Sequence, residues 1–235
     1  MRKLTVVFFV VFLSVTARAQ SYATFGAGFD ISSTLGYTDL VKQNPGYSYA
    51  AHVSYNYSAF VPISLELQRG KLSGGGDTFT LDKNLRKYEN NYTALFLRVE
   101  IQLGELLDKD NTVNDLLKNW FAGFGAGGVF SQVKTNRIKP DGSHYRFPGS
   151  DQSREFIASA RAGYALKFNN MFGEPTYVVS ICYVHNFDIG DGLDGYNDPP
   201  SKFKNRDTDH YRQLLIGITY NFGPIQTYYR QRTYR

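Results

Sequence analysis

The chain has almost no cysteine and no basic domain, and each shortage excludes a class of protein. One cysteine among 235 residues excludes a disulfide framework and any thiolate cluster for zinc or iron–sulfur. Of the 26 basic residues, three lie in residues 1–19 and three follow Phe222, and neither segment holds an acid. The remainder is close to neutral, so no domain is charged to follow a phosphate backbone. Nucleic acid is therefore not expected as a partner.

Long apolar runs are also scarce, in keeping with a mean hydropathy of −0.35. The one clear run, residues 4–15, follows the basic pair Arg2 and Lys3 and precedes the small-x-small pattern Ala17-Arg18-Ala19. It is too short to cross a bilayer and has the flanks of a secretory signal. We predict a signal peptide over residues 1–19, cleaved before Gln20, and therefore an exported protein.

Aromatic residues are abundant, with 18 Tyr and 18 Phe, and they recur with a period of two. In residues 47–57, aromatic or aliphatic side chains alternate with small or polar ones, as expected for a strand with one apolar face. Seven more segments alternate in the same way: residues 22–33, 63–68, 93–103, 120–131, 156–168, 177–186 and 211–222. The sequence therefore predicts an all-β protein of eight strands.

Two architectures fit this alternation, a soluble sandwich or barrel and a transmembrane β-barrel. Most segments are about as long as the 9–11 tilted residues that cross a bilayer, whereas soluble strands average about 5–6. The polar face is rich in Gly and Ser, which suits a narrow interior, and aromatic residues gather at segment ends. We predict an eight-stranded antiparallel up-and-down transmembrane barrel over residues 20–222, followed by a basic and aromatic tail, residues 223–235.

Connection lengths predict the orientation of this barrel. Four long polar connections, residues 34–46, 74–90, 133–154 and 188–208, alternate with those expected at the periplasmic end: 58–62, 104–119 and 169–175. With the N-terminus in the periplasm, the four long ones face outside, as in outer-membrane barrels. In the exceptional long periplasmic connection, Thr112 to Asp115 leading into Leu116 predicts a short capped helix.

These features together resemble the small outer-membrane β-barrel proteins of the OmpA/OmpX type over residues 22–222. The last strand also resembles the assembly signal of such proteins, Gly-x-x-aromatic-x-aromatic, here Gly217, Tyr220 and Phe222. Leu215 departs from that pattern, since the family usually has a polar residue there, and a tail follows Phe222. The resemblance implies a monomer in the bacterial outer membrane whose partners are lipid, lipopolysaccharide and the barrel assembly machinery.

Five charged residues fall on the predicted lumen face, namely Glu66, Arg98, Glu100, Arg161 and Lys167. By position along their strands, Arg98 and Arg161 lie nearer the middle of the barrel and the others nearer its periplasmic end. A narrow interior cannot leave such charges unpaired, because desolvating a lone charge is costly. The set predicts either an ion-pair plug or a polar path for ions and small solutes. Eight strands enclose a space that side chains just fill, which favours the plug.

Three other patterns carry possible chemistry. Residues 123–128 satisfy G-x-G-x-x-G, but a dinucleotide site needs a strand-to-helix turn, and here the glycines fall within a strand, where small side chains leave room for larger neighbours. His52 and Ser54 resemble the His and Ser pair of barrels that trim lipid A, although no carboxylate to orient the imidazole is evident nearby in sequence. Asp188, Asp191, Asp194 and Asp198 could hold calcium, but their spacing is not that of an EF-type loop.

We therefore expect no catalytic residues, no cofactor and no established metal site. The predicted role is structural or in surface interaction through the outer loops. A narrow channel and, less in keeping with the residues, a lipid A-modifying enzyme are the alternatives. In the tail, Tyr228, Tyr229 and Tyr234 alternate with Arg230, Arg232 and Arg235, which fits either a disordered end or contact with anionic headgroups or an acidic periplasmic partner.

Overall fold

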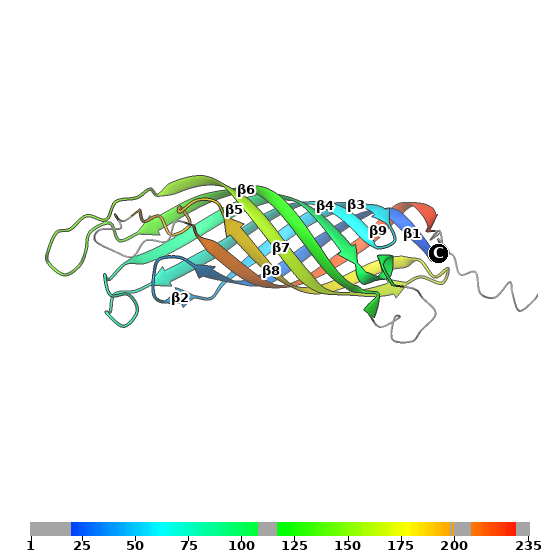
Figure 1. Ribbon diagram of the computed structural model, residues 1–235, viewed down its shortest axis with the longest axis horizontal. Coiled ribbons are helices and arrows are strands. Elements are labelled where there is room, and N and C mark those ends of the chain that lie inside the picture. The colour runs from blue at the N-terminus through cyan, green and yellow to red at the C-terminus, as the bar shows by residue number, and fades with distance from the viewer. Residues whose placement is uncertain (1–19, 108–116, 198, 200–207, 229–235) are drawn as a thin grey trace, which may run out of the picture.

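The computed structural model describes residues 20–107, 117–197, 199 and 208–228. The predicted signal peptide, Asp198 and the residues after Tyr228 lie outside this described part. Eight long strands account for most of the described chain (Figure 1). They are β1 (Gln20–Tyr37), β3 (Gly46–Ser58), β4 (Val61–Gly75), β5 (Lys87–Gln102), β6 (Trp120–Thr135), β7 (Gln152–Asn169), β8 (Pro175–Asp188) and β9 (His210–Tyr228).

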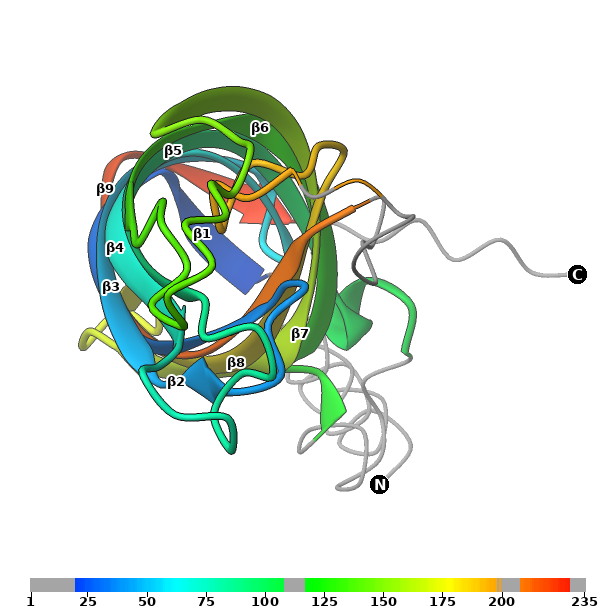
Figure 2. The same ribbon diagram turned by 90° about the vertical axis from the view of Figure 1, so that its left-hand side faces the viewer.

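The eight strands form a closed antiparallel ring. Each long strand pairs with the next along the chain, and β9 pairs with β1 to complete the circle. Figure 2, which looks along the barrel, shows this closure. A two-residue strand, β2 (Gln43–Asn44), pairs with β4 in the first long connection. The predicted eight-stranded up-and-down barrel is confirmed.

Alternation along each strand separates an apolar exterior from a filled interior. In β5, Leu97 is 58% exposed whereas its neighbours Phe96 and Arg98 are 0% and 1% exposed. The same alternation leaves aliphatic and aromatic side chains on the outer surface of every long strand, among them Phe29, Val53, Leu65, Leu95, Phe124, Phe156, Ile181, Ile216 and Ile218. Closure of the ring pairs both edges of each of the eight long strands, and the exterior of the described barrel is apolar. These are the two requirements for crossing lipid. The protein is an outer-membrane β-barrel.

One end of the barrel carries short turns and aromatic side chains. The connections after β3 and after β7 are short, and β1 begins and β9 ends at this same end (Figure 1). Aromatic rings contact one another here across strands, including Phe25 with Phe222 and Tyr177 with Tyr220. We identify this as the periplasmic end with its interfacial aromatic girdle, so the four long connections face outside.

Helical structure is minor. The described part of the second periplasmic-side connection contains one 3-10 turn, η1 (Leu103–Glu105), while the predicted helix start, Thr112–Asp115, lies outside the described residues. Among the described residues, no helix has the length and apolar character needed to span a bilayer.

The last strand corrects the predicted end of the barrel. β9 continues past Phe222 to Tyr228, and its final residues pair with the start of β1. The register shifts where Thr24 faces Gly223 and Pro224, and Gly223 has φ of +93°. Thr24 donates a hydrogen bond to the Pro224 carbonyl at 2.7 Å. A β-bulge accommodates both a left-handed glycine and a residue without an N–H, so Gly-Pro does not end this strand.

Candidate functional site

The centre of the lumen is crossed by a layer of ion pairs. Arg98, 1% exposed, lies with its Nε 2.9 Å from Glu66 Oε2, and its Nη2 donates to Glu66 Oε1 at 3.1 Å. Its remaining Nη1 donates to Ser159 Oγ at 2.6 Å. Arg161 Nη1 lies 3.1 Å from Glu100 Oε1 and 3.7 Å from Glu66 Oε2. Four of the five predicted lumen charges thus form one network contributed by β4, β5 and β7.

Glycines on β6 make space for this network. A Cβ at Gly125 would lie 2.8 Å from Arg98 Cγ, and one at Gly123 would lie 2.9 Å from Glu100 Cγ. A larger side chain at either position would therefore require the aliphatic part of Glu100 or Arg98 to shift. The Gly-rich stretch of β6 therefore serves packing, as its place within a strand indicated.

Lys167 occupies the periplasmic end of the lumen. Its Nζ donates to the Ala59 carbonyl at 3.0 Å and lies 4.8 Å from the centre of the Phe60 ring. Its contacts therefore reach the turn between β3 and β4, below the layer that contains Arg98.

A second, uncharged layer lies on the extracellular side of the ion pairs. Gln213, 1% exposed, donates to Ser48 Oγ at 2.8 Å and accepts from Asn186 Nδ2 at 3.0 Å. Tyr211 donates to Gln68 Oε1 at 3.3 Å, and the Tyr211 and Tyr92 rings lie 5.2 Å apart. Both tyrosines are fully buried. Amide and phenol groups thus fill the cross-section of the barrel at this level.

A cavity of about 90 Å³ remains in the periplasmic half of the lumen. Its lining is polar on several strands and includes Asp30, His52, Arg161 and Thr219. This volume has room for several water molecules beside polar partners. Water can therefore occupy the periplasmic half of the lumen, as far as the ion-pair layer.

His52 has a carboxylate partner that the sequence did not reveal. Its Nδ1 lies 2.9 Å from Asp30 Oδ2, and its Nε2 lies 3.0 Å from Thr219 Oγ1. This order of acid, imidazole and hydroxyl is that of a nucleophile triad. Ser54, the residue singled out with His52, is not a partner of the imidazole in these contacts. The Thr219 hydroxyl faces a small interior cavity, which has no room for the acyl chains of lipid A.

The assembly-signal residues lie together on β9. Tyr220 and Phe222 face outward at the periplasmic girdle, 48% and 43% exposed, with ring centres 6.1 Å apart. Gly217 faces inward, where a Cβ would collide with the Asp30 carboxylate. The glycine is therefore required by the Asp30–His52 pair, whatever its part in assembly.

Two acidic residues of the fourth outer connection have buried side chains. Asp194 and Asp209 are fully buried, each with one oxygen bound to a backbone N–H: Asp194 to that of Tyr196 and Asp209 to that of Leu193. Burial raises the pKa of Asp194 to about 7 and holds the pKa of Asp209 well above its usual value. Among the described residues, no three His, Cys, Asp or Glu side chains are placed to hold a metal ion.

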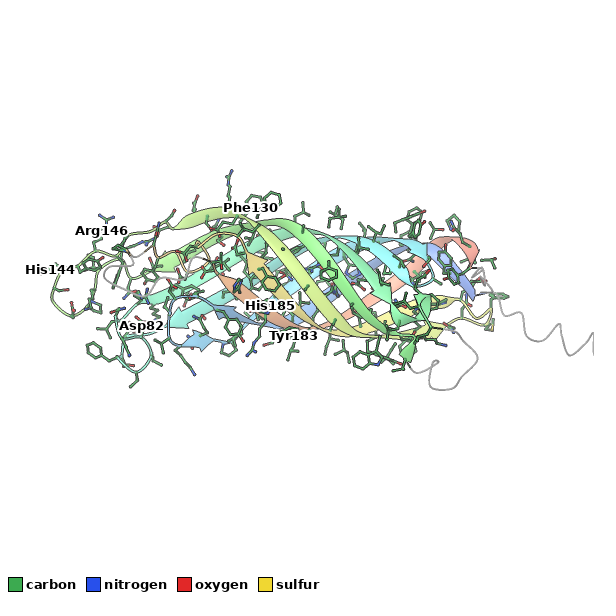
Figure 3. All side chains as sticks on the ribbon, in the orientation of Figure 1. Asp82, Phe130, His144, Arg146, Tyr183 and His185 are labelled. Carbon is green, nitrogen blue, oxygen red and sulfur yellow. The ribbon has the colours of Figure 1, made fainter. Side chains whose placement is uncertain are left out.

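The outer connections pack into a cap. Tyr196 of the fourth donates to the Lys87 carbonyl at 2.9 Å and contacts the Phe147 ring of the third at 5.5 Å. Arg137 donates to the Gly195 carbonyl at 2.8 Å, and Arg86 donates to the Asp39 carbonyl at 3.1 Å. All four outer connections are therefore joined, and Figure 2 shows them lying over the end of the barrel. Figure 3 places Asp82, His144 and Arg146 at this outer end.

Sequence reasoning missed Asp30 and the amide and phenol layer. Asp30 lies on the polar face of its strand, and in the first hairpin Asp30 pairs with Ala50 while Gly28 pairs with His52. The register of that hairpin, once assigned, would have placed Asp30 diagonally across from His52. Gln68 and Gln213 are also on lumen faces, but their contact spans the barrel and has no signal in local sequence.

No protein-family model matches the chain, and no curated protein matches it in sequence. Among solved structures, Neisserial surface protein A is similar at 12% identity and a TM-score of 0.47, covering 86% of this chain and 99% of that chain. Ail, the attachment invasion locus protein of Yersinia pestis, gives 11% and 0.44, covering 86% and 99%. The outer membrane protein AlkL gives 14% and 0.46, covering 89% and 94%. The barrel assignment rests on the strand pairing and the apolar exterior described above.

Proposed function

We propose that this protein is a plugged outer-membrane barrel that acts at the cell surface through its outer connections. The observation that carries the proposal is the contrast between the lumen and the outer connections. The lumen is crossed by two layers of fully buried polar side chains, while the outer connections form one packed cap.

The buried layers argue against a conducting lumen. An ion moving past Arg98 and Glu66 would have to separate a pair in which both side chains are 1% exposed. Breaking such a pair leaves an uncompensated charge, at a cost of about 3–5 kcal/mol. The passing ion would then meet the hydrogen bonds of Gln68 and Gln213, which water does not reach.

The packed cap favours recognition at the surface. A surface held by hydrogen bonds and ring contacts between connections is pre-organised, and pre-organisation lowers the entropy lost on binding. The tip of the third connection, residues 140–144, extends beyond this packing and is exposed. The Ile138–Arg146 bridge at its base would allow the tip to be shortened without disturbing the cap.

The partners we propose are those of a membrane barrel. Outer-membrane lipid and lipopolysaccharide would surround the apolar exterior, and the barrel assembly machinery would recognise Gly217, Tyr220 and Phe222. Among the described residues, each of the eight long strands has both edges paired within the ring, which supports a monomer.

The test compares a variant of the outer connections with a variant of the lumen, so that a role at the surface and a role as a channel give different results. In a deletion strain, the wild type is compared with a variant whose residues 140–144 are replaced by Asn-Gly, and with the lumen variant Glu66→Gln/Arg98→Leu. Attachment of intact cells to solid and cell surfaces is measured together with uptake of small solutes. The proposal predicts that only the tip variant loses attachment and that solute uptake is the same with and without the protein. Uptake that depends on the protein, with attachment unchanged in the tip variant, would favour a channel instead.

A further inference from the structure

A basic and aromatic patch lies on the outer surface where β8, β9 and β1 reach the extracellular end. It consists of Tyr37, His185, Phe187, His210 and Arg212. The strand register places His185 beside Arg212 and Phe187 beside His210, and on the other side of β9 it places Tyr37 beside His210. Three side chains that can carry positive charge thus lie on three adjacent strands, facing away from the lumen.

Ring contacts hold these side chains as one surface. The His185 ring lies 4.5 Å from the Phe187 ring, 5.8 Å from the His210 ring and 6.3 Å from the Tyr37 ring. The Arg212 guanidinium lies 5.1 Å from the centre of the Tyr37 ring. The arginine therefore stacks on an aromatic face that orients its N–H groups along the protein surface.

The patch carries no compensating acid within the described part of the chain. Its one side-chain hydrogen bond is between His185 Nδ1 and the Tyr183 hydroxyl, at 3.1 Å. Elsewhere at the outer end, the half-buried cations Lys71 and Arg137 pair with Glu89 and Asp151. The patch therefore has positive charge and donor capacity that the protein itself does not use.

Its depth in the membrane follows from the apolar rows below it. Ile216 pairs with Ile181 and with Ile31, and all three are more than half exposed to lipid. Arg212 lies four residues further along β9, roughly 14 Å at about 3.4 Å per residue, or about 10 Å along the tilted axis. Figure 3 places Tyr183 and His185 at the level of Phe130, between the mid-barrel and the outer loops. An arginine there lies where the hydrocarbon ends and lipid headgroups begin.

We propose that this patch binds the phosphate of a phosphorylated glycolipid headgroup in the outer leaflet of the membrane. The planar guanidinium of Arg212 matches two phosphate oxygens, and charge-assisted hydrogen bonds of this kind are the strong ones. His185 and His210 supply further N–H donors beside it. The aromatic rings of Tyr37 and Phe187 pack against the apolar part of the same lipid. The lateral position selects a membrane lipid, since the surface faces the leaflet rather than the aqueous phase.

The experiment uses the full mature chain refolded into detergent micelles that contain lipid A, lipid A stripped of its phosphates, or inorganic phosphate alone. Native mass spectrometry counts the lipid that stays bound. The variants are Arg212→Gln/His185→Gln and, as a control that removes at least as much positive charge away from the patch, Lys42→Gln/Lys83→Gln. A single variant, His210→Gln, gives an independent test if the double variant fails to fold, with folding checked by heat-modifiable migration.

The proposal predicts that lipid A binds the wild type and the lysine control equally. It predicts binding at least about tenfold weaker in the patch variants, and equally weak for stripped lipid A in every protein. Inorganic phosphate should not displace lipid A at millimolar concentration. Equal binding by the patch variants, or undiminished binding of stripped lipid A, would overturn the proposal. Displacement by inorganic phosphate would show that the patch binds a soluble anion and would also refute it.

Discussion

Removing Arg98 should destabilise the barrel far more than the loss of one side chain's packing. Arg98→Leu deletes the 2.9 Å ion pair and the 3.1 Å hydrogen bond to Glu66. Glu66, itself 1% exposed, would keep Arg161, at 3.7 Å, as its ion-pair partner. Breaking a buried pair from one side typically costs about 3–5 kcal/mol, so we expect a loss of that size in the free energy of unfolding.

The double variant Glu66→Gln/Arg98→Leu supplies the discriminating result. With both charges gone, no buried carboxylate remains to be compensated, and most of the lost stability should return. Arg161 retains Glu100 at 3.1 Å in this background. Unfolding in urea from lipid vesicles, followed by Trp120 fluorescence and heat-modifiable migration, measures all four members of the cycle. If the double variant is as unstable as the sum of the two single variants, the charges do not depend on each other and the reasoning fails.

Three further predictions concern the exterior, the last strand and the cap. Leu97→Arg should destabilise the barrel folded in vesicles by about 2–4 kcal/mol, because Leu97 faces lipid. The variant Phe79→Arg, in an outer loop, should be as stable as the wild type. Truncation after Tyr228 should leave the folded fraction unchanged. Truncation after Phe222 should lower the free energy of unfolding by about 2–4 kcal/mol, because several strand hydrogen bonds worth roughly 0.5–1.5 kcal/mol each are lost. Equal effects of the two truncations would contradict the extension of β9 to Tyr228. Burial raises the pKa of Asp194 from 3.8 to about 7, so the folded cap holds a proton that the unfolded chain releases, and cap stability should fall as pH rises from about 4 to about 7. Hydrogen exchange of the outer connections measures this slope. Asp194→Asn should reduce the slope, and the buried carboxyl of Asp209, whose pKa is also raised, should supply the remainder.

The strands and their two faces could be predicted because both depend on local pattern. Alternation over long segments identifies a lipid-facing and a lumen-facing row without knowledge of the partners. The side of each strand is then fixed, which is why Glu66, Arg98, Glu100 and Arg161 were recognised as lumen residues from sequence. Their pairing follows from the small cross-section of an eight-stranded barrel.

The remainder depends on contacts that no local pattern records. Gly223-Pro224 has the composition of a strand end, yet closure with β1 supplies partners that carry β9 on through a bulge. Asp30 and His52 meet because of hairpin register, and Gln68 meets Gln213 across the ring. The cap is less predictable still, since Tyr196 contacts Lys87 and Phe147 from connections far away in sequence.

The most direct test of the plugged lumen is single-channel recording of the wild-type barrel in planar bilayers. Side chains that are at most 1% exposed fill two successive levels of the lumen, including Glu66, Gln68, Arg98 and Gln213. We therefore predict no stable conductance steps from the wild type over a range of voltages, with insertion verified by heat-modifiable migration of the recovered protein. Reproducible ohmic steps from the folded wild type would contradict the account.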